Sequence, residues 1–476
     1  MIRFLFLTAV ALFLTIIPGA AFGQTGSPGT MEMSENAPGA MRVSPDEAVE
    51  LAIKNNLGLE RQRVSVATKQ RASAYAWNKF LPTINLLGGA NINSVSADTT
   101  GDFAQPDMTK QTVDTSATAF QGQAQVQLNI NFALFEAVKA LRMDYEGGLL
   151  SLEQAKLQME RDIRKSYYNI ILLEEQSRQL QESLSNAERQ AVSAEAQYRA
   201  GRQPELSYLQ ARVNVENMKP SVEQARNGLR LTKSQFAMTL GLPLDTDFEL
   251  VLPEESVNYI PLDMKELARQ AKDNNPEIRV QRQQLRALMS QRKAQMYQKW
   301  TPSISLGWTG SFSNQDSNNS VSTNLGNSKQ NQSVSSMNNT VNLGLSWTVS
   351  SLLPFGPDAQ SIKDLDDNVK TLSIALAQAE QGTELDITNK VYSLEQIRSG
   401  IEAKRAAVEL AERSYAETLR AYNNGQQSLL QARDAGLQRQ NARLNLSQQE
   451  SDYLQGLIDL EYSIGVPFGS LTARTE

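Results

Sequence analysis

The chain has 476 residues, of which 21% are charged, and its formal net charge of −6 makes it mildly acidic. It contains neither cysteine nor histidine, which excludes thiol nucleophiles, disulfides, imidazole bases and the commonest zinc ligands. An acidic chain is unlike a general nucleic-acid binder, so we expect no nucleic-acid partner. These features disfavour an enzyme, although carboxylate-only catalysis stays open.

The N-terminal segment 1–23 is typical of a secretory signal peptide. Arg3 precedes a short apolar run, and the small residues Ala21 and Gly23 suit a cleavage site. A retained membrane anchor is the alternative, which the shortness of the run disfavours. We expect residues 24–44 to form a flexible N-terminal segment. No later segment approaches the roughly 20 apolar residues of a membrane helix, so a membrane would have to be crossed by strands.

The sequence contains an internal duplication. The segment DIRKSYYNI, which begins at Asp162, recurs as DITNKVYSL from Asp386, and the same offset superimposes YRAG on YNNG and LGLPL on IGVPF. Upstream, AIKNNLGLE matches AKDNNPEIR at a slightly smaller offset. We therefore expect a first structural repeat at 45–244, a linker at 245–262 and a second structural repeat at 263–476.

Each repeat is predicted to open with a helix and to continue with two strands. The helices, at 45–79 and 263–299, end before a proline because the residue that precedes proline avoids helical angles. Apolar and polar residues then alternate, which places them on opposite faces of a strand. The four alternating segments are 83–93, 119–132, 303–313 and 340–350. Polar loops at 94–118 and 313–339 are expected between the strands of each pair.

A very long helix and a returning helix complete each repeat. The long helices are predicted at 137–200 and 358–423, and the first has apolar residues at coiled-coil spacing. The consecutive glycines Gly147 and Gly148 are a candidate break in that helix. A glycine then ends each long helix and turns the chain back. Pro220 is expected to kink the first returning helix because it removes a backbone donor.

The four alternating segments contain no Asp, Glu, Lys or Arg. A cation on the lipid-facing side of a membrane strand costs about 2–4 kcal/mol near the bilayer midplane. We therefore interpret the segments as transmembrane strands with one face toward lipid and a polar face toward a water-filled lumen. Soluble hairpins are the alternative. Four strands cannot close a barrel, for which about eight is the working minimum, so we expect copies of the chain to share one.

In this order of elements, the chain resembles the TolC family of outer-membrane efflux channels. The resemblance covers nearly all of the chain after residue 23, and it rests on the start AKDNNPEIR, the turns YRAGRQPELSYLQA and YNNGQQSLLQARDA, and the ends LGLPL and IGVPF. It implies a mainly α fold with transmembrane β structure. The internally duplicated chain would place four β-strands in a shared trimeric barrel, which a long α-helical periplasmic barrel continues.

The resemblance also implies a function and partners. It predicts a homotrimer in outer-membrane lipid that extends into the periplasm and docks on a periplasmic membrane-fusion adaptor and an inner-membrane transporter. Such a channel is the passive exit duct of a tripartite efflux or type I secretion system, with no catalytic, cofactor-binding or metal-binding residues. Small molecules and polypeptides both fit as cargo. The alternatives are a trimeric outer-membrane stalk or adhesin and a periplasmic adaptor protein.

Two helix turns are the candidate functional sites that the resemblance implies. The family's turns form the periplasmic tip, which is the gate and the adaptor contact, and the matching residues are Tyr198, Gly201, Arg202, Tyr422 and Gly425. At the family's charged gate positions stand Ser207, Gln427, Gln431 and Asp434, of which only the last is a carboxylate. We hypothesise that Arg202 pairs with Asp434 in the closed state. A solvated helix-end charge is the alternative.

Aromatic residues precede the first strand of each pair. Phe80 and Trp300 fit two structural roles equally well. They suit the membrane–water boundary, where aromatic side chains collect, and they equally suit packing at the junction between strands and helices.

Overall fold

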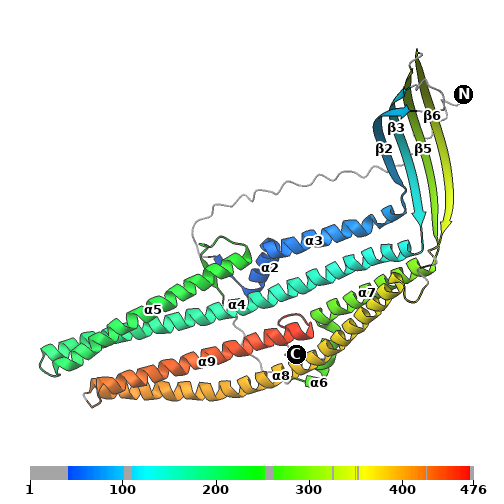
Figure 1. The fold of residues 1–476 in the computed structure, drawn as a ribbon. Helices are drawn as coiled ribbons and strands as arrows, with labels where there is room; N and C mark the ends of the chain where they lie inside the picture. Colours follow the sequence, from blue (N-terminus) through cyan, green and yellow to red (C-terminus); the bar gives the residue numbers. More distant parts are fainter. Residues whose placement is uncertain are drawn as a thin grey trace. The chain divides into compact units, whose positions relative to one another are not determined.

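The computed structural model describes residues 41–100, 110–251, 262–323, 326–348, 350, 353–424 and 426–471. The predicted signal peptide lies outside the described residues. In the described part, long helices pack beside one another, and the strands form one four-stranded and one two-stranded sheet (Figure 1). Among the helices in these ranges, none is both long and apolar enough to cross a membrane.

The predicted duplication is confirmed by the order of elements. The first half contains β1 (Met41–Val43), α2 (Pro45–Asn55), α3 (Leu57–Ala74), the 3-10 helix η1 (Ala76–Phe80), β2 (Thr83–Thr100), β3 (Lys110–Ile130), α4 (Ala133–Arg199), α5 (Glu205–Leu240) and β4 (Phe248–Leu250). The second half contains α6 (Met264–Asn274), α7 (Pro276–Trp300), β5 (Ser303–Thr323), β6 (Gly326–Ser346), α8 (Pro357–Asn423) and α9 (Leu429–Ile464). The long helices α4 and α8 each have 67 residues, and the returning helices α5 and α9 each have 36.

The prediction of one continuous opening helix in each repeat was wrong. Asn56 separates α2 from α3, and Asn275 separates α6 from α7. Both asparagines have a non-helical backbone, and the side-chain oxygen of each accepts hydrogen bonds from the first backbone N–H groups of the next helix. An asparagine side chain that caps a new helix in this way competes with continuation of the old one.

The long helices extend without the break expected at Gly147 and Gly148. A Cβ added to Gly148 would lie 2.9 Å from the Cδ of Lys69, so this glycine allows α3 to lie close against α4. Pro220 lies inside α5, which is helical on both sides of it. The coiled-coil seam is confirmed, since α4 and α5 bury one apolar cluster between them: Leu184, Ala187, Ala191, Ala194, Ala211, Val215 and Val222.

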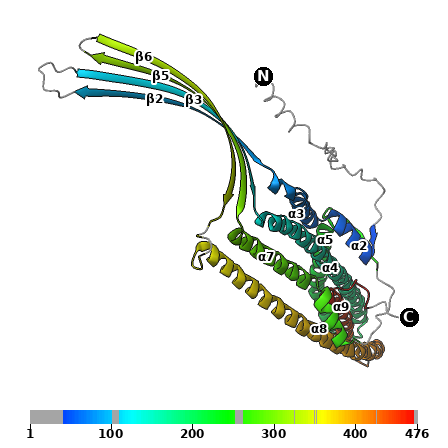
Figure 2. The same ribbon diagram turned by 90° about the vertical axis from the view of Figure 1, so that its right-hand side faces the viewer.

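The four-stranded sheet has the antiparallel order β2-β3-β5-β6, and the strands curve together side by side (Figure 2). All four strands extend beyond the uncharged segments at the end away from the helices, so the predicted loops 94–118 and 313–339 are mostly strand. At the end next to the helices, β3 and β6 stop at Ile130 and Ser346, before the predicted ends at 132 and 350. Thr323 pairs with Gly326 at the far end of β5 and β6. Backbone hydrogen bonds alone hold these antiparallel strands together. Side chains add further bonds between strands, such as the one that the Ser333 hydroxyl donates to the Oδ1 of Asp316 at 2.6 Å.

Within the uncharged segments, the register places most apolar residues of the four strands on one face, because directly paired residues point to the same side of a sheet. Val126 pairs with Ile84 on one side and Trp308 on the other, and Trp308 pairs in turn with Val341. The neighbouring row consists of uncharged polar residues on the opposite face, from Asn85 through Gln125 and Thr309 to Thr340. The predicted amphipathic strands are therefore confirmed in register as well as in sequence.

Two short strands were not predicted from the sequence. β1 ends the segment expected to be flexible, and β4 lies in the segment expected to be a linker; the two form the two-stranded sheet. The hydroxyl of Tyr167 on α4 donates to the carbonyl oxygens of Val43 and Val251, which lie 2.8 Å and 2.7 Å away. The phenol thus fixes both strand ends against α4, beside the apolar core that α2, α4 and α5 share.

Candidate functional site

The turn between α4 and α5 is a glycine-terminated helix end. Gly201 has a φ of +70°, a conformation that favours glycine. The N–H of Arg202 donates to the carbonyl of Gln197 at 2.9 Å, which satisfies one of the last helix carbonyls. Tyr198 stacks on Tyr208 of α5 with ring centroids 6.1 Å apart. The YRAG motif therefore builds a rigid turn between the two helices.

The turn between α8 and α9 repeats this geometry. The N–H of Gln426 donates to the carbonyl of Ala421 at 2.8 Å, as its counterpart does in the first turn. Tyr422 is buried, whereas Tyr198 is partly exposed. Gly425 lies outside the described residues. The two turns thus share a backbone hydrogen bond but expose different side chains.

The gate candidates lie close to these turns, and one of them has a structural role. The Gln431 side chain accepts from the N–H of Ser428 at 2.9 Å, and the Ser428 hydroxyl accepts from the N–H of Gln431 at 3.3 Å. This reciprocal capping box begins α9. Gln431 is therefore committed to helix capping in this conformation, a role that the Ser-x-x-Gln spacing in the sequence already signals.

The remaining gate candidates are polar residues at the beginnings of α5 and α9. The N–H of Ser207 donates to the carbonyl of Pro204 at 3.1 Å, and Gln427 is exposed. Asp434 accepts from Arg433 at 3.3 Å. Within the described residues, Asp434 pairs with Arg433 and not with Arg202, and the hypothesised pairing stays a prediction about the assembled tip.

A groove of about 410 Å³ lies beside the tip, between α4, α5 and the beginning of α9. Leu206 and Leu209 of α5 and Leu430 of α9 are exposed and line it. Leu429 packs against the apolar seam of α4 and α5. This groove was missed from the sequence, because it needs two segments that lie more than 200 residues apart in the chain to meet.

A joint with the same geometry holds each returning helix to the broken opening helix. The Nδ2 of Asn275 donates to the carbonyl of Ser463 at 2.8 Å, and that of Asn56 donates to the carbonyl of Thr239 at 3.0 Å. Gly465 completes the second joint with a φ of +76°, and a Cβ there would lie 2.3 Å from the Asn274 carbonyl oxygen. In each repeat, the Asn-Asn motif therefore lies against the end of the returning helix, which carries Leu-Gly in the first repeat and Ile-Gly in the second.

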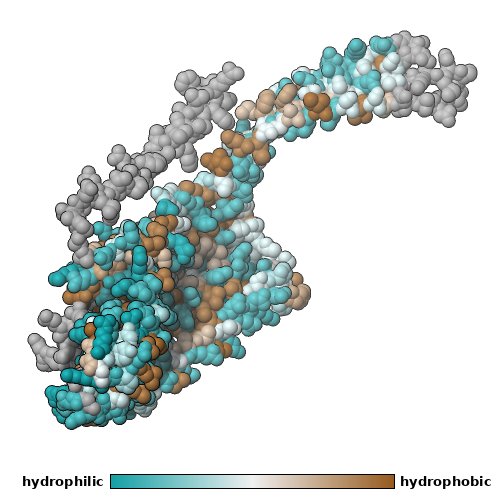
Figure 3. All heavy atoms as spheres, turned by 90° about the vertical axis from the view of Figure 1, so that its left-hand side faces the viewer, coloured by the Kyte–Doolittle hydropathy of each residue, from teal (hydrophilic) through white to brown (hydrophobic). Residues whose placement is uncertain are grey.

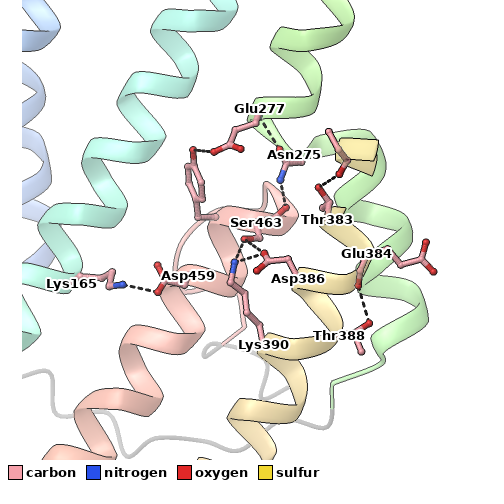
Figure 4. A network of polar contacts seen from close by, with 12 residues as sticks. Lys165, Asn275, Glu277, Thr383, Glu384, Asp386, Thr388, Lys390, Asp459 and Ser463 are labelled. Carbon is pink, nitrogen blue, oxygen red and sulfur yellow. Dashed lines mark hydrogen bonds and ion pairs between the residues drawn. The ribbon is translucent and has the colours of Figure 1, made fainter. Parts of the chain in front are cut away.

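A polar network surrounds the second joint, at the meeting point of α4, α7, α8 and α9 (Figure 4). Lys165 of α4 lies 2.6 Å from Asp459 of α9, and Lys390 donates to both Asp386 and Ser463. The guanidinium of Arg161 lies 4.6 Å from the ring centroid of Tyr462. The contacts of Lys165 and Arg161 bind the first repeat to the second, and we call these two contacts the repeat seam. The contacts of Lys390 join α8 to α9 within the second repeat.

Burial perturbs two ionisable groups near the joints. Burial raises the pKa of Tyr167 to about 12. Burial also raises the pKa of Glu461, although the N–H groups of Leu471 and Gly469 donate to its carboxyl group at 2.9 Å and 3.0 Å and favour the charged form. Both groups hold backbone segments in place and face no reaction site.

The aromatic residues before the strands differ between the repeats. Phe80 packs on Phe135 of α4 with ring centroids 5.2 Å apart, which supports the junction-packing alternative for this residue. Trp300 is exposed, and Lys299 lies 5.7 Å from its ring centroid. The two positions are therefore not structurally equivalent.

The apolar face of the four-stranded sheet is exposed in the described chain. Hydrophobic atoms gather on the part of the sheet that adjoins the helices, and its far part is mainly hydrophilic (Figure 3). Leu86, Leu343 and Leu345 are each more than 70% exposed. Contiguous exposed apolar surface of this kind marks an interaction site. Together with the helical hairpins, this sheet defines a membrane-associated channel component.

The protein family that the sequence matches agrees with the assignment to membrane-associated channels. The family model for outer membrane efflux proteins matches the chain twice, over residues 48–241 and 267–466. The chain therefore belongs to the outer membrane efflux protein family, which is a family of channels and not of enzymes. No curated protein matches the chain in sequence.

Solved structures of bacterial channels share the fold. The Campylobacter jejuni outer membrane channel CmeC is similar with a TM-score of 0.69 and 15% identity, covering 91% of this chain and 87% of that one. The outer-membrane channel OprN has a TM-score of 0.68 and 14% identity, covering 89% and 90%. Vibrio cholerae VceC has a TM-score of 0.65 and 16% identity, covering 89% and 96%. The chain is accordingly an outer-membrane efflux protein that extends into the periplasm.

Proposed function

We propose that this protein is the passive exit duct of a tripartite efflux or type I secretion system, working as a homotrimer. The observation that carries the proposal is the sheet register. Within the uncharged segments of β2, β3, β5 and β6, it aligns mostly apolar residues on one face and polar residues on the other. Such a sheet suits lipid on one side and a water-filled lumen on the other.

The edges of the sheet support the homotrimer. In the described part of the chain, β2 and β6 pair with a neighbouring strand on one side only. Open edges are not tolerated in a bilayer, because unpaired backbone groups there cost several kcal/mol each. Three copies of four strands would give a twelve-stranded barrel, which leaves an aqueous lumen wider than that of an eight-stranded one.

The tip supports docking to a periplasmic adaptor and an inner-membrane transporter. The turn at Tyr198 and the groove lined by Leu206 and Leu430 present apolar surface at the far end of the helices from the strands. In this proposal the inner-membrane transporter supplies the energy, and the duct performs no catalysis of its own. Gating occurs at the tip, where Asp434 is the one candidate that carries a charge.

Single-channel conductance in a planar bilayer tests the proposal, together with the native mass of the detergent-extracted protein. We expect a trimer with discrete pores. A monomer without conductance would refute the duct. In the Asp434→Ala variant we expect more frequent opening, because the carboxylate is lost from the closed tip. An unchanged closed state would remove Asp434 from the gate and leave the duct itself standing.

A further inference from the structure

A pocket of about 320 Å³ lies beside the second joint, where residues of α7, α8 and α9 and one residue of α4 surround it. Three of the residues that line it, Glu277, Gly382 and Asp386, are exposed, so the pocket opens to solvent. All of its walls belong to one chain. The exit duct proposed above gives this pocket no role.

The charged residues of the pocket leave one carboxylate without an ion pair. Two cations and three carboxylates give the lining a formal charge of −1: Arg161, Lys390, Glu277, Asp386 and Asp459. Lys390 pairs with Asp386, and Asp459 pairs with a lysine of α4 (Figure 4). Arg161 pairs with the neighbouring Asp162. Within the described residues, Glu277 takes part in no ion pair, and the hydroxyl of Tyr462 donates to it at 3.4 Å.

Glu277 shares the pocket with two further acceptors. One turn along α7, the Oε1 of Gln281 is buried and has no hydrogen-bond partner among the described residues. On α8, the hydroxyl of Thr383 donates to the carbonyl of Ala379 at 2.8 Å, so its oxygen can still accept. A buried acceptor without a donor is costly, and most such groups in proteins have a partner. The pocket therefore lacks a hydrogen-bond donor.

The duplication shows that this pocket is not a requirement of the fold. The residues that build the joints recur in both repeats, as Asn56 with Asn275 and Gly241 with Gly465. Three residues of the pocket do not recur. In the first repeat, the counterparts of Glu277, Gly382 and Tyr462 are Gly58, Gln158 and Met238. The second joint has thus acquired a carboxylate and an open space that the first joint does without.

We propose that this pocket binds a small organic cation, whose primary ammonium group lies among Glu277, Gln281 and Thr383. An ammonium group has three donors and no acceptor, which matches the three acceptors. Its charge complements the formal charge of the lining, and a hydrogen bond to a carboxylate is stronger than one between neutral groups. The alkyl part of the ligand lies against Ile278 and Ala379, which also line the pocket.

The glycine of α8 provides room for the ligand. A Cβ built on Gly382 meets no atom within 4 Å, so the space beside it is open. Its counterpart Gln158 carries a side chain long enough to occupy the corresponding space in the first repeat. Gly382 is therefore part of the site through the volume that it leaves free.

An anion fits this pocket less well than a cation. Both cations of the lining already pair with carboxylates, Lys390 with Asp386 and Arg161 with Asp162. An anion would have to compete with these pairs, and it would lie beside the unpaired Glu277, which repels it. The charges of the lining therefore select for positive ligands.

Equilibrium dialysis tests the proposal with radiolabelled n-butylammonium and the detergent-solubilised, full-length protein at pH 7. We expect one saturable site in each chain, with an affinity that falls as salt is added. n-Butyrate has a similar size and the opposite charge, so it should show no saturable binding. The measurement does not use conductance, and its result is therefore independent of whether the chain forms a duct.

Two variants assign the binding to this pocket. Glu277→Gln keeps the shape of the side chain and removes its charge, so n-butylammonium should bind at least about tenfold more weakly. Gly382→Gln introduces the residue found at the counterpart position of the first repeat, and it should abolish binding by filling the space. The control is Glu384→Gln, since Glu384 pairs with Lys272 and does not line the pocket. Its affinity should equal that of the wild type.

Thermal unfolding followed by circular dichroism verifies that each variant is folded. The absence of saturable n-butylammonium binding to the folded wild-type protein would overturn the proposal. Wild-type affinity in both Glu277→Gln and Gly382→Gln would overturn it as well, because the ligand would then lie elsewhere. Equal weakening in Glu277→Gln and Glu384→Gln would reveal a general effect of charge and no site. Saturable binding of n-butyrate in place of n-butylammonium would reverse the predicted sign of the ligand.

Discussion

The side-chain amide of Asn275 donates a hydrogen bond of 2.8 Å to the main-chain carbonyl of Ser463 and so ties the beginning of α7 to the last turn of α9. The Oδ1 of the same side chain accepts from the N–H groups of Glu277 and Ile278. Asn56 makes the equivalent contacts in the first repeat. One asparagine in each repeat therefore ends one helix, begins the next and holds a third.

Replacement of Asn275 tests the energy of this joint. In Asn275→Ala, the buried carbonyl of Ser463 loses its donor and α7 loses its cap, so we expect a destabilisation of about 2–4 kcal/mol. Asn275→Asp keeps the capping oxygen and should cost less. Thermal unfolding in detergent, followed by circular dichroism, measures both. Equal stability of the two variants would mean that the capping oxygen contributes nothing, and wild-type stability of Asn275→Asp would mean that the bond to Ser463 contributes nothing.

Gly465 is expected to resist substitution by any residue with a Cβ. Its φ of +76° is unfavourable for alanine, and the new atom would lie 2.3 Å from the Asn274 carbonyl oxygen. We expect Gly465→Ala to destabilise the protein by more than about 2 kcal/mol. Gly228, inside α5, is the control, because a Cβ there meets no atom within 4 Å. Gly228→Ala should stabilise by about 0.5–1 kcal/mol, so similar effects of the two substitutions would contradict the argument.

The raised pKa of Tyr167 predicts that the folded protein loses stability at alkaline pH. Its pKa is raised to about 12 in the folded protein, against about 10 in an unfolded chain. The stabilisation is therefore complete below pH 10 and is lost as the pH rises toward 12, by an amount on the order of 2 kcal/mol. Tyr167→Phe should be less stable at pH 8 and lose less between pH 10 and 12. Parallel pH curves for the two proteins would refute the assignment.

The Lys165–Asp459 pair predicts a modest coupling along the repeat seam. Both side chains are about one-third exposed, so solvent screens the attraction. A double-mutant cycle with Lys165→Met and Asp459→Asn should give a coupling energy of about 0.5–1 kcal/mol that falls with added salt. The exposed pair of Lys219 with Glu216 is the control, and its cycle should give a smaller value.

Whether a strand residue lies on the apolar or the polar face of the sheet predicts whether that position tolerates a charge. Leu343 lies on the apolar face and its neighbour Asn342 on the polar face. Leu343→Lys places a cation toward lipid and should cost about 2–4 kcal/mol, with less folded trimer in the outer membrane. Asn342→Lys should assemble normally and change the ion selectivity of the channel. Normal assembly of both variants would argue against lipid on the apolar face.

The fold could be predicted to a large extent because its signals are local and repeated. Three elements are specified by their own residues. They are the strand with alternating residues in 119–132, the long helix with apolar residues at coiled-coil spacing through Leu184 and Ala191, and the turn at Gly201. The duplication then confirmed each assignment by a second copy. One error arose where a single polar side chain decided the outcome, at Asn56, whose cap breaks a helix that periodicity alone would continue.

Local patterns in the sequence were enough to predict the long helices, the order of the main elements, their duplication and the uncharged amphipathic strands, because periodicity and turn chemistry act over a few residues. The contacts between elements could be seen only in the folded chain. Folding joined Asn275 to Ser463, Lys165 to Asp459 and the ends of β1 and β4 to Tyr167. These contacts link residues far apart in the chain, and they depend on the packing of helices whose own sequences do not name their neighbours.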